Sequence, residues 1–478
     1  MLFNSISFAL FLPVVFILYW FVTAKSLKWQ NILLLISSYF FYACWDYRFL
    51  FLLIFSTVLD FYTGIKISES NKITSKKFWF WTSVCINLGF LGVLKYYNFF
   101  ASSFADVITT LGFKCHVSTL NVILPIGISF YTFHGLSYII DIYKDKIKPT
   151  KNFIDYSVFV SFFPLLVAGP IERATHLLPQ IQSKRNFDYT KAVDGLRQIL
   201  WGLFKKVVIA DNCAEYADLI FNNSSNYSGS TLVLGAVFFA FQIYGDFSGY
   251  SDIALGTARL FGIELLKNFS FPYFSRDIAE FWRRWHISLS SWFKDYLYIP
   301  LGGSKDGTWL KIRNTFIIFL VSGFWHGANW TFIAWGAFHA LFFLPLLLFN
   351  KNRSHIEIVA KGKMLPSLKE FSSMLLTFLW VVLAWIFFRA DTMPQAINYI
   401  SHIFTSALFK MPEIRPSLVI MVMAVFIFME WIGREKNYAL ENFAIHLSKP
   451  LQWAFHLLVF TVIILCMGKE QPFIYFQF

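Results

Sequence analysis

The chain has 478 residues, of which 57% are hydrophobic, 21% aromatic and 14% charged. Soluble domains carry roughly a quarter charged residues, so this composition excludes an ordinary soluble protein. The net charge of +13 lies in short connections between apolar runs. The positive-inside rule explains this placement, which differs from the basic domain of a nucleic-acid-binding protein. The five cysteines show no CxxC spacing and indicate apolar fillers, not a disulfide or metal framework.

Apolar windows of about 20 residues recur along the chain, and this is the length that crosses a bilayer as a helix. Because the apolar positions do not alternate with polar ones, they predict helices and not a β-barrel. The first span covers residues 3–22 and is followed directly by Lys25 and Lys28, so we expect its N-terminus on the non-cytoplasmic side. Taken together, the runs predict an all-α, multi-pass membrane protein with about 11 or 12 crossings. We expect one membrane domain over residues 1–478.

Two later segments are interrupted in ways that predict something other than a plain crossing. Residues 155–173, DYSVFVSFFPLLVAGPIER, are short and broken by proline and glycine. Such a segment is typical of a re-entrant hairpin surrounded by protein. Residues 314–349 predict a hairpin, or a broken pair of helices, around the sequence WHGANW.

The stretch 271–335 gathers polar and aromatic residues, and we expect the catalytic core within residues 230–350. In FWRRWHISLSSWFKDYLYIP the spacing of the large apolar residues predicts a basic amphipathic helix at the membrane interface. One interpretation is an anchor at the lipid headgroups. The other is that Arg283 and Arg284 hold an anionic, phosphate-bearing donor at the mouth of a cavity. The apolar positions of this helix are Phe281, Trp285, Leu289, Trp292 and Tyr296.

His326 is the leading candidate for a catalytic residue. It lies between Trp325 and Gly327 in sequence apolar enough for membrane depth, where ionisable groups are rare and often functional. A neutral imidazole there can take the proton from an attacking hydroxyl or thiol. Gly323 and Gly327 would let a ligand approach closely. The alternative is a buried histidine that donates to a backbone carbonyl.

A second polar cluster, YGDFSGYSDIALG at residues 244–256, interrupts an apolar segment. In one interpretation, Asp246 or Asp252 orients a histidine or lines a polar tunnel. In the other, these side chains cap a helix or form hydrogen bonds between helices. The sequence leaves both open. It contains no HExxH motif, P-loop or GxSxG elbow, and we expect no metal.

The segments RDIAEFWRRWHISLSSWFKDYLYIPLGGS and FLVSGFWHGANWTFIAWGAFHA closely resemble the membrane-bound O-acyltransferase family. Within that family, the bacterial polysaccharide O-acetyltransferases of the alginate and peptidoglycan type are the best match. The resemblance extends to LPIGISFYTFHGLSYIIDIY, FFPLLVAGPIER, GLFKKVVIAD and FQIYGDFSGYSDIALG, so that it covers nearly the whole chain.

The resemblance implies a helical fold with re-entrant segments around a central cavity or tunnel. It implies that His326 is the essential histidine, as catalytic base or acyl relay, and that His286 is the second. Weaker expectations concern two further groups of residues. Supporting roles are expected for Asp246, Asp252, Trp325 and Asn329. Contacts with the donor are expected for Arg283 and Arg284.

By the same resemblance, the protein lies in the bacterial cytoplasmic (inner) membrane, among membrane lipid, and takes acetyl from a cytoplasmic donor, acetyl-CoA. No cofactor would be tightly bound. The acetyl group would cross the membrane for O-acetylation of a polysaccharide acceptor, with an extracytoplasmic acetyltransferase as partner protein. No nucleic acid is expected to bind.

Two other functions stay open at this stage. A D-alanyl transfer protein for teichoic acid belongs to the same family, and the sequence does not show whether a carrier protein docks on its cytoplasmic side. A transporter or flippase coupled through Asp246 or Asp252 belongs to a different class. That function predicts an internal repeat, which the sequence does not display.

Overall fold

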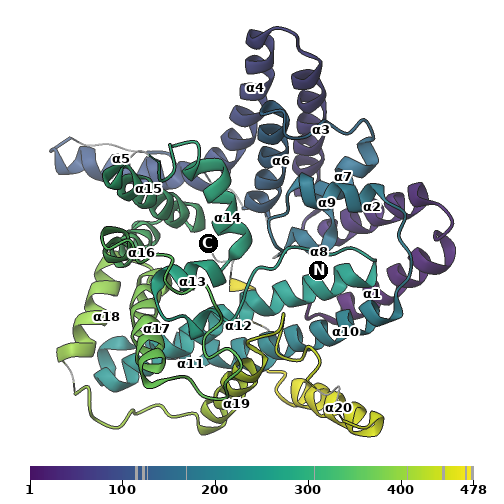
Figure 1. The fold of residues 1–478 in the computed structure, drawn as a ribbon. Helices are drawn as coiled ribbons and strands as arrows, with labels where there is room; N and C mark the ends of the chain where they lie inside the picture. The colour runs from purple at the N-terminus through teal and green to yellow at the C-terminus, as the bar shows by residue number, and fades with distance from the viewer. Residues whose placement is uncertain are drawn as a thin grey trace. The chain divides into compact units, whose positions relative to one another are not determined.

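A computed structural model describes residues 1–113, 117–120, 124–125, 127–167, 169–305, 307–405, 407–443, 447–468 and 471–474. This part of the chain is helical, and its regular elements include no strand (Figure 1). The predicted all-α class is therefore confirmed. The chain divides into two compact units, Met1–Tyr189 with Ala258–Leu266, and Thr190–Thr257 with Lys267–Phe478. The single membrane domain and the core at residues 230–350 stay predictions.

Five helical stretches in the described residues are long and apolar enough to cross a membrane. The described residues also include shorter apolar helices, such as Ile6–Val22, and the number of about 11 or 12 crossings stays a prediction. The five stretches are Tyr47–Glu69, Ile73–Thr110, Gly229–Leu260, Trp330–Leu348 and Leu368–Arg389.

In the first unit, the predicted re-entrant segment is broken as expected. Helix α7 ends at Ser161, Phe162 lies outside the helix, and the short helix α8 begins at Phe163. The side chains of both helices are mostly buried, as a re-entrant segment surrounded by protein would require, and the re-entrant hairpin itself stays a prediction. The helices of this unit are α1 (Ile6–Ile17), α2 (Leu27–Ala43), α3 (Tyr47–Glu69), α4 (Ile73–Leu91), α5 (Tyr97–Thr110), α6 (Ile128–Tyr143), α7 (Phe153–Ser161), α8 (Phe163–Leu166) and α9 (Ala174–Gln182).

The second unit carries all the predicted site residues. The main helices that build it are α10 (Tyr189–Leu203), α11 (Asp211–Asn222), α12 (Gly229–Leu260), α13 (Ile278–Arg284), α14 (Ile287–Phe293), α15 (Thr308–His326), α16 (Trp330–Leu348), α17 (Leu368–Arg389), α18 (Met393–Thr405), α19 (Ser417–Gly433) and α20 (Lys449–Leu465). Two π-helical turns join them, η3 (Phe204–Ala210) after α10 and η6 (Lys294–Tyr298) after α14.

Helices α15 and α16 form the hairpin predicted around WHGANW (Figure 1). They pack closely because glycines face the partner backbone: a Cβ on Gly323 would lie 2.2 Å from the Phe332 carbonyl oxygen. A Cβ on Gly327 would lie 2.1 Å from the Phe332 ring. The expectation that these glycines admit a ligand is therefore wrong, since helix α16 occupies the space. Small residues at such contacts are typical of membrane helix pairs.

The predicted continuous amphipathic helix around His286 is also wrong. Helix α13 ends at Arg284, and α14 begins at Ile287. Between them His286 has φ of 43°, in the left-handed region that a side chain disfavours. The break turns His286 into the protein, where it is fully buried. An uninterrupted helix would not redirect the side chain in this way.

Candidate active site

His326 is the last residue of α15 and lies at the closed end of the α15–α16 hairpin. Its side chain is buried and surrounded by aromatic rings. The ring centroids of Trp325, Trp335 and Phe388 lie 4.8, 5.1 and 5.3 Å from that of the imidazole. Such walls exclude water and fix the plane of the ring, as a positioned base requires.

His286 is held by Asn268 in a defined tautomer. The Asn268 side-chain oxygen accepts from the Ser288 hydroxyl at 2.8 Å and from the Ser288 backbone N–H at 3.4 Å. Because the same oxygen lies 3.0 Å from Nδ1 of His286, that nitrogen must carry the proton and donate it. Nε2 is then a bare acceptor, with no hydrogen-bond partner among the described residues. Burial lowers the pKa of His286 to about 3, so the ring is neutral.

The structure brings the two predicted catalytic histidines to the same tryptophan. The Trp325 ring lies 6.1 Å from the ring of His286 and 4.8 Å from the ring of His326, centroid to centroid. Asn329, by contrast, caps α16: its Oδ1 accepts from the Thr331 N–H at 3.1 Å. Asn329 therefore has a structural contact, while Trp325 lies inside the site.

The two predicted acids lie in ion pairs with adjacent lysines at the start of η3. Asp252 is 2.5 Å from Lys205 Nζ and also accepts from Gln198 at 2.8 Å. Asp246 is 2.7 Å from Lys206 Nζ. Neither acid has a histidine partner among its contacts in the described residues. These contacts favour the structural interpretation over the orientation of a histidine.

A short segment near the end of the chain reaches the same buried acid. The Ile474 N–H donates to Asp246 at 2.6 Å, and Lys206 donates to the Gln471 carbonyl oxygen at 3.1 Å. Phe473 is fully buried and stacks on Tyr250, with ring centroids 4.4 Å apart. Sequence analysis missed this segment and the two lysines. An acid such as Asp246 in an apolar segment needs a cation beside it, and this could have pointed to a lysine. No sequence pattern indicated that residues 471–474 contact Asp246.

Arg283 and Arg284 are hydrogen-bonded within the protein. Arg283 donates to the carbonyl oxygens of Asn352 and His355 at 2.9 and 2.7 Å. Arg284 is buried and donates to Glu280 at 2.7 Å. A donor-binding role for either residue stays a prediction that these contacts do not support.

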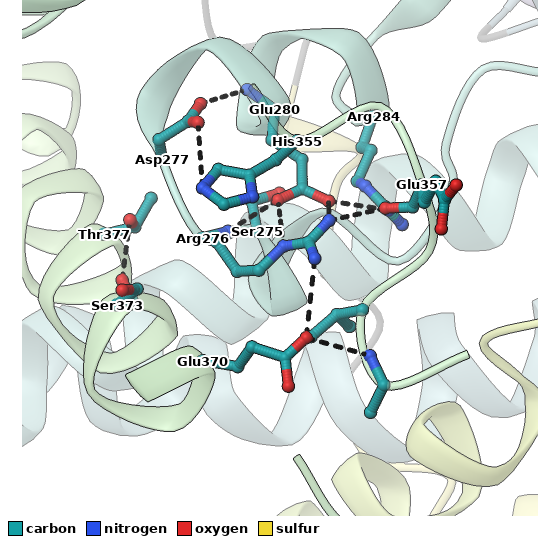
Figure 2. A network of polar contacts seen from close by, with 12 residues as sticks. Ser275, Arg276, Asp277, Glu280, Arg284, His355, Glu357, Glu370, Ser373 and Thr377 are labelled. Carbon is teal, nitrogen blue, oxygen red and sulfur yellow. Dashed lines mark hydrogen bonds and ion pairs between the residues drawn. The ribbon is translucent and has the colours of Figure 1, made fainter. Parts of the chain in front are cut away.

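Figure 2 shows the ion-pair network in which Arg284 takes part. The buried Glu280 carboxylate forms ion pairs with Arg276 and Arg284, with N–O distances of 3.0 and 2.7 Å. Asp277 caps α13 by accepting from the Glu280 N–H at 2.7 Å. Arg276 also donates to Glu370 at 3.5 Å. The network fixes α13 directly before the break that buries His286.

We expect Glu280→Gln to lower the free energy of unfolding of the second unit by about 2 kcal/mol, because two charge-assisted hydrogen bonds lose their charge. Thermal unfolding in detergent measures this as a lower melting temperature. Glu357→Gln is the matched control, since the network uses only its backbone carbonyl oxygen, which accepts from Arg276. Equal melting temperatures for the two variants would show that the network does not stabilise α13.

The described helices define a polytopic membrane protein, in which two buried histidines lie against Trp325. Residues 144–382 match the model of the membrane-bound O-acyltransferase family. Together with the relatives below, this match shows that the chain belongs to that family and is an acyltransferase. No group of three or more potential metal ligands occurs in the parts of the chain that the structure describes.

The chain is similar to a probable alginate O-acetylase of Pseudomonas aeruginosa, with 40% identity over 87% of this chain and 77% of the relative. It is 38% identical to a peptidoglycan O-acetyltransferase of Helicobacter pylori over 83% of this chain and 79% of the relative. A teichoic acid D-alanyltransferase of Streptococcus thermophilus is 33% identical over 45% of this chain and 55% of its own length. The similarity to the two O-acetylating relatives thus covers much more of the chain.

Proposed function

We propose that this enzyme takes acetyl from cytoplasmic acetyl-CoA and passes it across the membrane for O-acetylation of an extracytoplasmic polysaccharide. The polymer would be alginate-like or peptidoglycan. An acetyltransferase on the far side would complete the transfer, and the protein would lie in the bacterial inner membrane. The observation that carries the proposal is the pair of buried histidines on Trp325, in a chain similar to O-acetylases over most of its length.

The proposed step is acyl transfer by general-base catalysis. An acceptor hydroxyl attacks the thioester carbonyl carbon, the new C–O bond forms, and His326 takes the hydroxyl proton. The C–S bond then breaks, and the imidazolium returns the proton to the leaving sulfur. The products are an acetyl ester and free CoA, so atoms and charge balance. His286, neutral and with Nε2 bare, can accept a hydrogen bond from the acceptor hydroxyl or from the thiol.

The two alternative functions have less support. D-alanyl transfer would follow the same chemistry, but similarity to the D-alanyltransferase covers only 45% of this chain. Transport coupled through Asp246 or Asp252 requires acids that can exchange protons, whereas each acid lies in a close ion pair with a lysine. Both observations favour O-acetylation.

The proposal is tested in a bacterium that carries this gene, by comparing the parent, a deletion strain and a deletion strain complemented with the gene. We expect ester-linked acetyl groups on one extracytoplasmic polymer to disappear on deletion and to return on complementation. Mass spectrometry of isolated alginate-like polymer and of peptidoglycan identifies which one. Unchanged acetylation together with loss of D-alanine esters from teichoic acid would replace the proposal with the D-alanyl alternative.

A further inference from the structure

A cavity of about 480 Å³ lies in the second unit, between helices α12, α17 and α19 (Figure 1). The loop before α13 completes its wall with Phe271, Tyr273 and Phe274. On each helix the lining residues recur mainly at intervals of three or four, so that one face of the helix borders the cavity. These faces run from Leu234 to Tyr244 on α12, from Phe371 to Phe378 on α17 and from Ile420 to Glu430 on α19.

The wall offers almost nothing to a polar ligand. Tyr244, Tyr273 and Glu430 are the residues with polar side-chain oxygens among the described lining residues. The Tyr244 hydroxyl and the indole N–H of Trp201 donate to the two oxygens of Glu430. The Tyr273 hydroxyl donates to the Ala240 carbonyl oxygen at 2.6 Å. Because both tyrosine donors are already used inside the protein, a polar occupant would lose hydrogen bonds to water and recover few.

The cavity extends from the surface of the protein into its interior. Among the lining residues, Phe371 and Leu375 are 52% and 48% exposed, whereas Tyr244 and Phe426 are buried. Helix α17, which carries the two exposed residues, is long and apolar enough to cross a membrane. Its exposed apolar side chains therefore face lipid, and the cavity is continuous with that surface. Apolar cavities stay free of water, so hydrocarbon is the medium that can enter this one.

The size of the cavity fits one hydrocarbon chain. Its lining residues on α12 and on α19 extend over ten positions, which is about 15 Å of helix and equals half of the bilayer's hydrocarbon core of about 30 Å. Since a cavity of about 150 Å³ binds benzene, a cavity of this volume has room for about 19 carbon atoms. Spread over this length, the volume gives a cross-section of about 30 Å², whereas a helix about 10 Å across needs about 80 Å². A partner's helix is therefore too wide.

We propose that this cavity binds one acyl chain of a membrane phospholipid, as a structural lipid and not as a substrate. The chain supplies contacts to side chains that would otherwise border a void. Tyr244 and Tyr273 in the wall lie 6.1 and 6.0 Å from the ring of Trp285, which directly precedes His286. A bound chain thus supports the aromatic layer next to the site. The inference goes beyond the proposed function and does not depend on it.

The test uses the purified full chain in phospholipid nanodiscs, in which a small share of the phospholipid carries a photoactivatable diazirine on its acyl chain. Irradiation joins this chain to the side chains that it touches, and peptide mass spectrometry identifies them. Met374 and Met423 are buried and line the cavity, whereas Met421 is exposed and lies outside it. We expect label on all three methionines. Lipid that only surrounds the protein would label Met421 alone.

Ala424→Trp is the variant that fills the cavity, because Ala424 is exposed and belongs to its wall. Val425→Trp is the matched control, since Val425 is exposed at the next position and lies outside the cavity. We expect label on Met423 to fall about tenfold in Ala424→Trp, where the indole overlaps the chain, and to stay unchanged in Val425→Trp. Label on Met421 should be the same in both variants.

Label confined to Met421 in the wild type would overturn the inference, and this result requires no variant. Full labelling of Met423 in a folded Ala424→Trp protein would also contradict it. Label on the buried methionines from a diazirine-bearing isoprenoid phosphate, but not from phospholipid, would mean that another apolar chain is the occupant. None of these measurements involves acetyl transfer, so the proposed function is tested separately.

Discussion

His326→Ala is expected to lower kcat for acetyl transfer by about 10²- to 10⁴-fold, the range that a positioned general base contributes. Three rings that contact it, those of Trp325, Trp335 and Phe388, carry no basic nitrogen that could take over the role of the imidazole. The measurement is the steady-state transfer of radiolabelled acetyl from acetyl-CoA to the acceptor in proteoliposomes.

His339→Gln is the matched control for this prediction. His339 is also a fully buried histidine of the same aromatic cluster, 4.9 Å from the Trp335 ring, and its Nδ1 accepts from Trp282 at 3.3 Å. We expect this variant to keep kcat within about tenfold, because a glutamine oxygen can accept the same hydrogen bond. Equal losses in the two variants would show that the cluster needs imidazoles only for packing.

Asn268→Ala is expected to lower kcat by about 100-fold, by analogy with the upper end of the losses seen when the hydrogen-bond partner that orients a metal-binding imidazole is removed. Without Asn268, nothing assigns the proton to Nδ1 of His286, and the ring can present an N–H where Nε2 should accept. Asn268 acts through His286 and is therefore a positioning residue. The measurement is the pH dependence of kcat in the wild type and in two variants.

The pH profile separates this role from a purely structural one. Burial holds the pKa of His286 at about 3, so the wild type should show no titration of this ring above pH 5. In Asn268→Asp, a carboxylate beside Nδ1 favours the imidazolium and raises that pKa. Activity should then be lost at low pH and recover as pH rises through the new pKa. A profile for Asn268→Asp that matches the wild type would contradict the assignment of His286.

The sequence predicted those features that depend on local pattern. Membrane-length apolar runs gave the helical class, and the break in WHGANW gave the α15–α16 hairpin. His286 and His326 stood out because polar groups are rare in such sequence, and the structure brings both to Trp325.

Features set by distant contacts could not be predicted. The helical spacing of the apolar residues predicted one continuous helix through His286. The left-handed turn at His286 is accompanied by a contact with Asn268, which lies in an earlier loop and which local spacing does not reveal. Asp246 gained its partners from Lys206 and from Ile474, which lies 228 positions further along the chain. Arg284 appeared available for a donor until the structure placed Glu280 against it.

The central claim is that acetyl passes from cytoplasmic acetyl-CoA through a site built on His326. Sealed proteoliposomes with the cytoplasmic face outward test it, with acetyl-CoA outside and the acceptor or partner protein inside. The account predicts that wild type releases CoA outside while acetyl esters appear inside, and that His326→Ala does neither although it folds and inserts normally. Full activity in His326→Ala, or acetyl esters formed only on the outer side, would contradict it.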